Sequence, residues 1–190
     1  MSVLPIILLV DDDDDDRLML AEAFAEQAPG CQLAYASSGA ECFRYLSQTT
    51  QLPALILLDL NLPAMNGFEI LHQLRTTPPW KKLPVVILST TRNQEQINRA
   101  YQDGANSFVT KPNKFEDVTH MAELLCNYWL NLVQLPQAKD VREKSYVSFK
   151  PTAGPGAEGG LYSDVGAQSH VEEHLSQPLV WRDAQYRRTG

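Results

Sequence analysis

Residues 6–16 read Ile-Ile-Leu-Leu-Val-Asp-Asp-Asp-Asp-Asp-Asp, an apolar run that gives way directly to six aspartates. A short run of Val, Ile and Leu is typical of a strand covered on both faces of a parallel sheet. The stretch has neither a basic start nor a small-residue cleavage site, so it reads as a buried strand and not as a signal peptide. The carboxylates therefore begin where the strand ends, and that is the edge at which open parallel sheets bind ligands.

Outward from this stretch, apolar runs alternate with longer segments of helical periodicity through residues 1–136. This alternation predicts βα units and an α/β fold, with a doubly wound, five-stranded parallel sheet between two layers of helices. The predicted strands are 6–10, 32–36, 54–58, 85–88 and 107–110, and the predicted helices are 14–27, 39–48, 67–76, 93–103 and 114–134.

The composition, 44% hydrophobic and 21% charged residues in a chain of 190, is that of an ordinary globular protein with one domain or one domain and a tail. It excludes a large multidomain enzyme. The formal net charge of −7 argues against binding to nucleic acid or to an anionic membrane surface. No apolar run is long enough to span a bilayer. The three cysteines, Cys31, Cys42 and Cys126, form no CxxC pair, which favours a reducing, cytoplasmic location.

The periodicity ends after Pro136, and a stretch rich in Gly and Pro follows at 151–160. We expect a folded domain over residues 1–136 and a largely disordered tail, without a recognised domain, over residues 137–190. A short helix near 170–180 is the one element we expect in that tail.

The tail also contains His170-Val-Glu-Glu-His174, which matches the H-x-x-E-H pattern of some zinc proteases. Catalysis there is disfavoured, because a zinc protease needs a third ligand and a folded domain around it. Binding of zinc by residues 137–190 would test this alternative.

Chemically active side chains follow the predicted strands at the end where each strand stops. Because the carboxyl ends of parallel strands meet at one edge of the sheet, we expect these side chains to converge there. They are three carboxylates, two hydroxyls and an ammonium: Asp11, Asp12, Asp59, Ser89, Thr90 and Lys111.

Three carboxylates in one small site repel one another, and a divalent cation resolves that repulsion. Mg²⁺ fits best, because it accepts one or two carboxylates, keeps several waters and is completed by phosphate oxygens. If one carboxylate attacks a phosphoryl group, the metal neutralises the developing charge while Lys111 and Ser89 hold the equatorial oxygens. The arrangement predicts aspartyl-phosphate chemistry.

Four motifs carry a resemblance to a known family. They are Val10-Asp11-Asp12, the stretch Leu58-Asp59-Leu-Asn-Leu-Pro63-Ala-Met-Asn-Gly67, Leu88-Ser89-Thr90, and Gly104-Ala-Asn-Ser-Phe108-Val-Thr-Lys111-Pro112. In this order and at these spacings they resemble the receiver domain of two-component response regulators, the CheY-like family, over residues 3 to about 134. The Asp-rich start and residues 101–108 resemble the stand-alone regulators of bacterial phytochrome-type histidine kinases. The resemblance implies a flavodoxin-like sheet of order 2-1-3-4-5.

The resemblance also implies roles for the strand-end residues. Asp59 would be the phosphoacceptor, which takes a phosphoryl group from a histidine kinase or a phosphotransfer protein. Asp12, Asp59 and the backbone carbonyl of Asn61 would ligate Mg²⁺, and Asp11 would act through a metal-bound water. Lys111 would bind phosphoryl oxygens, as would Ser89. The protein would then be a single-domain signalling switch that acts through protein contacts, not an enzyme with a dedicated output domain.

The switch that the resemblance implies consists of Ser89, Thr90 and Phe108. Phosphorylation would draw Ser89 and its loop inward and let the ring of Phe108 turn toward the vacated space. Many relatives have Tyr where this chain has Phe108, so a hydroxyl for the loop after the fourth strand is missing here. The family also usually shows a cis peptide between Lys111 and Pro112, which is accessible at modest cost only before proline.

The aspartate run has two simpler interpretations. Asp13 to Asp16 are expected to be solvated carboxylates at the cap and in the first turn of a helix. An EF-hand loop is excluded, because its sixth position is Asp16 instead of glycine and no helix enters the loop.

A receiver fold that binds partners without phosphorylation is the alternative function, and it would be marked by loss of a site acid or of the lysine. Neither is lost here.

The last predicted helix has two apolar stripes. One is expected to face the core and comprises Phe115, Val118, Ala122, Leu125, Trp129 and Leu132. The second comprises Met121, Leu124, Tyr128 and Leu135. Either this second stripe is covered by the chain's own tail or it forms a homodimer surface.

The sequence does not distinguish a protein that passes its phosphoryl group on in a phosphorelay from one that is the terminal effector of its pathway.

Overall fold

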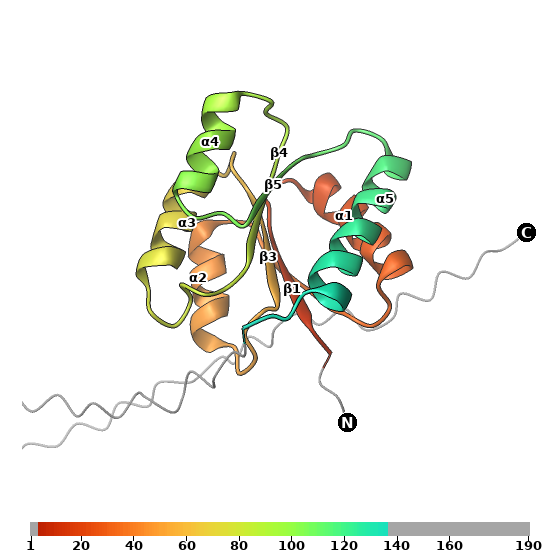
Figure 1. The fold of residues 1–190 in the computed structure, drawn as a ribbon, viewed down its shortest axis with the longest axis horizontal. Helices are drawn as coiled ribbons and strands as arrows, with labels where there is room; N and C mark the ends of the chain where they lie inside the picture. The colour runs from red at the N-terminus through yellow and green to blue at the C-terminus, as the bar shows by residue number, and fades with distance from the viewer. Residues whose placement is uncertain (1–3, 137–190) are drawn as a thin grey trace, which may run out of the picture. The chain divides into compact units, whose positions relative to one another are not determined.

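The computed structural model describes residues 4–136 and shows a central sheet between two layers of helices (Figure 1). The predictions for the tail fall outside these residues: the disorder of 137–190, the short helix near 170–180, and the pattern from His170 to His174. Within the described residues, no helix is long and apolar enough to cross a membrane.

The sheet has five parallel strands in the order β2-β1-β3-β4-β5, which confirms the predicted doubly wound topology. The strands are β1 (Ile6–Val10), β2 (Gln32–Ala36), β3 (Leu55–Asp59), β4 (Val85–Ser89) and β5 (Ser107–Thr110). Strands β3 and β4 each extend one residue beyond the predicted end. Asp59 and Ser89 are therefore the last residues of their strands, held by ladder hydrogen bonds instead of by a loop.

The helices are α1 (Asp14–Gln27), α2 (Gly39–Gln48), α3 (Gly67–Thr76), α4 (Gln94–Gln102) and α5 (Phe115–Cys126). Polar side chains fix where the first four begin. The side chain of Asp13 accepts hydrogen bonds from the first turn of α1, Ser38 does so for α2 and Asn93 for α4. Asn66 and Glu69 form a reciprocal capping box on α3. The predicted helix boundaries agree with these caps to within one residue.

Alternate strand residues supply two separate cores, one on each face of the sheet. Leu8 of β1 packs with residues of α2, α3 and α4, whereas Ile7 packs with residues of α1 and α5. Figure 1 shows the same division, with α2, α3 and α4 on one side of the sheet and α1 and α5 on the other. Both faces of the central strands are thus buried, and this explains why these strands are almost wholly apolar.

The predicted single helix over residues 114–134 is wrong in its second half. Helix α5 ends at Cys126 and continues as a π-helix, η1 (Asn127–Leu132). The wider turn rotates the following side chains relative to an α-helix. Of the predicted core stripe, Val118, Ala122 and Leu125 are buried, whereas Phe115 and Leu132 are exposed.

The second stripe is also divided between core and surface. Met121 is buried in the core between the sheet, α1 and α5, so it does not lie on an open face as predicted. Leu124 and Tyr128 are exposed, with 55% and 50% of their surfaces accessible. Together with Leu132, 71% exposed, they form an apolar patch on α5 and η1, which we call the α5–η1 patch.

Candidate functional site

The strand register brings the predicted site residues to one edge of the sheet. Val10 pairs with Leu58, so Asp11 follows its strand beside Asp59. Across the next ladders, Asp59 pairs with Leu88 and Ser89 pairs with Thr110, which Lys111 follows. The backbone N–H of Lys111 donates to the carbonyl of Ser89 over 2.9 Å, which ties these two strand ends together.

Burial separates this edge from the rest of the molecule. Among residues 4–136, the buried polar or charged residues are Asp11, Asp59 and Ser89, and all three are strand-end residues predicted for the site. Burying such groups costs free energy unless they are paired. Their location shows that the polar interior of this fold is concentrated at the carboxyl edge of the sheet.

Lys111 is the centre of the site. Its Nζ donates to Asp11 Oδ2 at 2.7 Å, to Asp59 Oδ2 at 2.8 Å and to Asp16 Oδ2 at 2.8 Å. Only 9% of the lysine side chain is exposed, and the side chain of Asp11 is fully buried. One ammonium is therefore shared by three carboxylates, one that follows β1, one at the end of β3 and one in the first turn of α1.

The pKa values of the buried groups follow from burial and from these contacts. Burial raises the pKa of Asp11, while the hydrogen bond and the charge of Lys111 oppose that rise. Burial by itself would lower the pKa of the Lys111 ammonium, but its hydrogen bonds to Asp11, Asp16 and Asp59 more than offset this and raise the pKa. The lysine therefore keeps its positive charge at neutral pH.

Asp59 is held at both carboxylate oxygens, since Oδ2 contacts Lys111 and Oδ1 accepts the Asn61 backbone N–H at 3.1 Å. The start of α3 lies directly against the same residue. A Cβ at Gly67 would lie 2.3 Å from the Asp59 carbonyl oxygen, so only glycine permits this close approach. The glycine that ends the second motif thus allows the start of α3 to pack directly against the end of β3.

A group of carboxylates suited to a cation lies at this edge. One oxygen from each of Asp11, Asp12 and Asp59 lies within 4.8 Å of the others. Asp12 is exposed, whereas both oxygens of Asp11 are already engaged, Oδ1 by the N–H of Asp13 and Oδ2 by Lys111. An all-oxygen donor set of this kind, open on one side, fits a hard divalent ion such as Mg²⁺.

The family model for the response regulator receiver domain matches residues 7–123, well over half of the chain. The chain belongs to this family. All four motifs that carried the resemblance lie within the matched segment.

Individual receiver proteins support the same assignment. The response regulator Rcp1 of a Synechocystis species is 38% identical over 86 residues, which cover 45% of this chain and 58% of Rcp1. The match thus spans a little over half the length of that relative. The structure of the phosphorylated cyanobacterial phytochrome response regulator RcpA aligns with a TM-score of 0.67 and 32% identity, over 70% of this chain and 99% of RcpA. The Mn²⁺-bound form of Rcp1 aligns with a TM-score of 0.64 and 31% identity, over the same shares.

The three predicted switch residues of the receiver occupy different environments. Ser89 is fully buried, and its Oγ accepts the backbone N–H of Thr91 at 3.3 Å. Thr90 is exposed beside it. Phe108 is partly buried and packs against the core that α2, α3 and α4 cover. The structure thus places a buried hydroxyl at the end of β4 and an aromatic ring on β5, as the receiver motifs predict.

Tyr101 supplies a hydroxyl that the sequence reading did not anticipate. Its oxygen, on α4, accepts the backbone N–H of Phe108 at 3.2 Å. The hydroxyl is thus provided to the backbone of β5 from the neighbouring helix, whereas position 108 itself offers none. Tyr101 lies seven residues before Phe108, and the intervening turn at Gly104, with a φ of 95°, brings the two together.

Two expectations for the site are wrong. None of the peptide bonds among residues 4–136 is cis, so the Lys111–Pro112 bond is trans, the isomer that is favoured even before proline. Asp16 is not merely a solvated first-turn carboxylate, because it pairs with Lys111.

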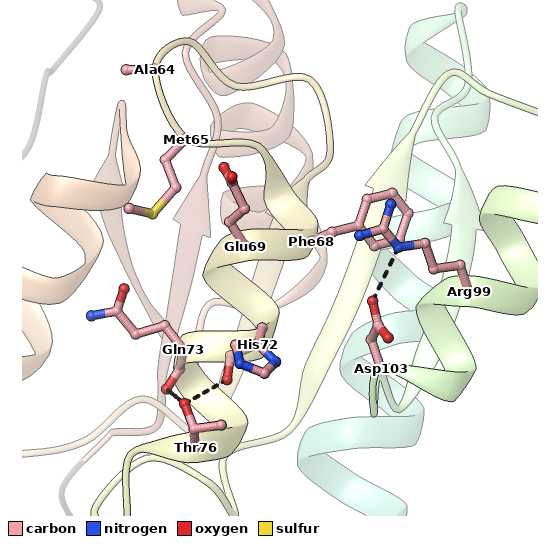
Figure 2. A pocket seen from close by; sticks show the side chains of 9 residues that line it. All are labelled: Ala64, Met65, Phe68, Glu69, His72, Gln73, Thr76, Arg99 and Asp103. Carbon is pink, nitrogen blue, oxygen red and sulfur yellow. Dashed lines mark hydrogen bonds and ion pairs between the residues drawn. The ribbon is translucent and has the colours of Figure 1, made fainter.

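A separate hollow of about 610 Å³ lies between α3 and α4 (Figure 2). The Arg99 guanidinium stacks 4.2 Å above the centre of the Phe68 ring and pairs with Asp103 at 3.3 Å. Glu69, which also lines the hollow, is engaged in the cap of α3. Arg99 and Asp103 are thus paired with each other, and Glu69 is engaged by the backbone N–H of Asn66.

Proposed function

We propose that this receiver domain accepts a phosphoryl group on Asp59 from a phosphohistidine of a histidine kinase or phosphotransfer protein. The observation that carries the proposal is the joint contact of Lys111 with buried Asp11 and Asp59, beside exposed Asp12. These residues lie at the carboxyl edge of an open parallel sheet, where ligands bind. Phosphorylation would switch protein–protein contacts.

In the transfer, a carboxylate oxygen of Asp59 attacks the phosphorus atom and forms an O–P bond. The P–N bond to the donor imidazole breaks, and its electron pair stays on the ring nitrogen. Lys111, which already lies 2.8 Å from Asp59, neutralises charge on the phosphoryl oxygens, and the Ser89 hydroxyl offers them a hydrogen bond. The trans peptide after Lys111 is compatible with this contact.

Mg²⁺ would be held by Asp12, Asp59 and the backbone carbonyl of Asn61, with Asp11 acting through a bound water. Bound Mg²⁺ would supply neutralisation of phosphoryl charge during the transfer. The hydrogen bonds of Asp11 support its indirect role, because both its oxygens already have partners, whereas Asp12 is exposed. Rcp1, which was crystallised in a Mn²⁺-bound form, supports a divalent cation in this family.

The proposed output is a change at Ser89, Thr90 and Phe108. A phosphoryl group on Asp59 would draw the Ser89 hydroxyl and its loop toward it, and the partly buried Phe108 ring would turn inward. The similarity to RcpA favours a phytochrome-type kinase as the partner.

A cytoplasmic location is also part of the proposal, and the three free cysteines support it.

The α5–η1 patch is proposed to contact a second copy of the chain. Leu124, Tyr128 and Leu132 expose half or more of their surfaces there, and exposed apolar patches often mark interfaces. Met121, which was predicted for the same surface, is excluded because it is buried. The alternative of an interaction module that works without phosphorylation is not favoured by any observation, since the acidic residues and the lysine are all in place.

The test is labelling with acetyl phosphate, a small phosphodonor, in the presence of Mg²⁺. The wild-type protein is expected to incorporate a base-labile phosphoryl group, and Asp59→Asn is expected to abolish it. Asp15→Asn is the matched control, because Asp15 is exposed and its carboxylate lies outside the Lys111 contacts. Labelling of Asp59→Asn at the wild-type level would refute the assignment.

A further inference from the structure

Lys111 has no free donor in this structure. An ammonium group carries three N–H bonds, and the Nζ of Lys111 contacts three carboxylates, all within 2.8 Å. A phosphoryl oxygen can therefore be bound by this nitrogen only if one of the carboxylates gives up its hydrogen bond. Which one does so determines how strongly the site holds the phosphoryl group.

The three partners differ in what release would cost. Asp11 is fully buried, so its carboxylate would lose its cation without gaining water. Asp59 would carry the phosphoryl group, and its contact at 2.8 Å keeps Lys111 beside the place where the phosphoryl oxygens would lie. Asp16 is 31% exposed and lies in the first turn of α1, so its carboxylate can be hydrated when it is released. Release of Asp16 is therefore the least costly of the three.

We propose that Asp16 is a positioning residue that holds Lys111 in the unphosphorylated protein and yields it to the phosphoryl group. This inference rests on the proposed phosphoacceptor function of Asp59. Asp16 pre-aligns the ammonium of Lys111 beside Asp59. The hydrogen bond between Asp16 and Lys111 must then be exchanged for one between Lys111 and a phosphoryl oxygen. Asp16 therefore acts as a competitor that lowers the affinity of the site for a phosphoryl group.

The charge of Asp16 acts in the same direction. Its Oδ2 and that of Asp59 lie at the same distance, 2.8 Å, from one nitrogen, so the two carboxylates are close neighbours. A negative charge there attracts a divalent cation and repels a tetrahedral anion bound to Asp59. Neutralising Asp16 should therefore change the affinities for these two ligands in opposite directions, whereas general loosening of the site would weaken both.

The test uses calorimetry on the full chain to measure two affinities. The first is the affinity for Mg²⁺ alone, and the second is the affinity for trifluoroberyllate, a tetrahedral phosphoryl analogue, at saturating Mg²⁺. Asp16→Asn is expected to bind trifluoroberyllate about five- to tenfold more tightly than wild type, and Mg²⁺ up to about twofold more weakly. Asp16→Glu, which keeps the charge, should stay nearer to wild type. Asp15→Asn is the control in the same helical turn and should change neither affinity.

A second readout needs no phosphoryl analogue. Solvent exchange of the Lys111 ammonium hydrogens, followed by ¹⁵N NMR, is expected to be faster in Asp16→Asn, because one of the three acceptors becomes weaker. Trifluoroberyllate affinity that is unchanged or reduced in Asp16→Asn would overturn the inference while leaving the role of Asp59 intact. A wild-type protein that does not bind trifluoroberyllate, or an Asp59→Asn variant that binds it equally well, would overturn both.

Discussion

The carboxyl edge of the sheet and the α5–η1 patch are opposites in chemical organisation. At the strand ends, the buried carboxylates of Asp11 and Asp59 share the Lys111 ammonium as a partner. On α5 and η1, large apolar side chains such as Leu124 and Leu132 are left in solvent beside a π-helix. One region has its charges paired internally, and the other leaves apolar surface uncovered.

The difference shows that a small receiver can respond through a fixed polar site or through an exposed apolar surface. The strand-end site is rigid, because the ladder hydrogen bonds of β1, β3, β4 and β5 fix where its side chains begin. The response proposed for it begins with an exchange of partners around Lys111, and movement of the Ser89 loop follows. The side chains of the α5–η1 patch are exposed instead of paired, and the response proposed for this patch is association with another molecule.

Breaking the strand-end site should give the largest effect. In Lys111→Met, buried Asp11 and Asp59 lose their cation, and the free energy of unfolding is expected to fall by about 3 kcal/mol near pH 7. Labelling with a small phosphodonor should fall at least a hundredfold. Urea unfolding followed by circular dichroism measures the first effect, and Lys114→Met, which removes an exposed lysine at the N-cap of α5, is the control.

The pH dependence sharpens this test. Burial raises the folded-state pKa of Asp11, and loss of Lys111 removes the groups that oppose the rise, so the variant should regain stability as acid protonates Asp11. The raised pKa of Lys111 means that its contribution is fully present below its ordinary value of 10.5 and is lost above the folded-state value. A stability difference that stays constant between pH 4 and pH 8 would contradict this account.

The second test separates core from surface along one helix. Met121→Ala removes a side chain buried between the sheet, α1 and α5, so the free energy of unfolding should fall by about 2 kcal/mol or more. Leu124→Ala removes a side chain that is 55% exposed and should change stability by less than about 0.5 kcal/mol. Chemical denaturation measures both variants.

Measuring self-association tests whether the α5–η1 patch binds a second copy of the chain. Sedimentation equilibrium of the wild-type protein and of Leu124→Ala, with and without trifluoroberyllate, is expected to show weaker association in the variant. A monomeric wild-type protein under all conditions would show that the α5–η1 patch does not bind a second copy. Equal association of both proteins would place the interface elsewhere.

The sequence predicted the strand-end residues because the topology of a parallel sheet determines where they lie. The position of Asp59, Ser89 and Lys111 at one edge needed only the apolar runs and the residue after each run, whereas the order of the strands came from the resemblance to receiver domains. What escaped prediction depends on packing across the fold. The contact of Asp16 with Lys111 joins residues far apart in the chain, and neither helical periodicity nor charge reveals it.

The end of the last helix is a second feature that the sequence pattern did not predict. The alternating spacings of three and four from residue 114 to 134 describe an α-helix, but a π-helix from Asn127 changes which side chains face the core. The position of Leu132 was therefore wrong, although Leu125, before the change, was predicted correctly as buried. Periodicity identifies a helix face only as long as the helix keeps its period.

The last test concerns the backbone beneath the site. In Gly67→Ala the new Cβ would lie 2.3 Å from the Asp59 carbonyl oxygen and 2.7 Å from the Leu60 Cα, so α3 or the end of β3 must shift. Overpacking of this kind costs about 1–3 kcal/mol. Because Asp59 would move with β3, phosphodonor labelling should fall several-fold, as measured by the initial rate at saturating Mg²⁺.

Gly30→Ala is the matched control, because nothing lies within 4 Å of a Cβ at that position. It should unfold at the same denaturant concentration as the wild type and should label at the same rate. If Gly67→Ala lost stability without losing labelling, α3 alone would have moved and Asp59 would be positioned by its contacts with Lys111 and Asn61. Loss of both would show that the approach of α3 at Gly67 is what fixes the phosphoacceptor, and that the rigidity of the site extends into its backbone.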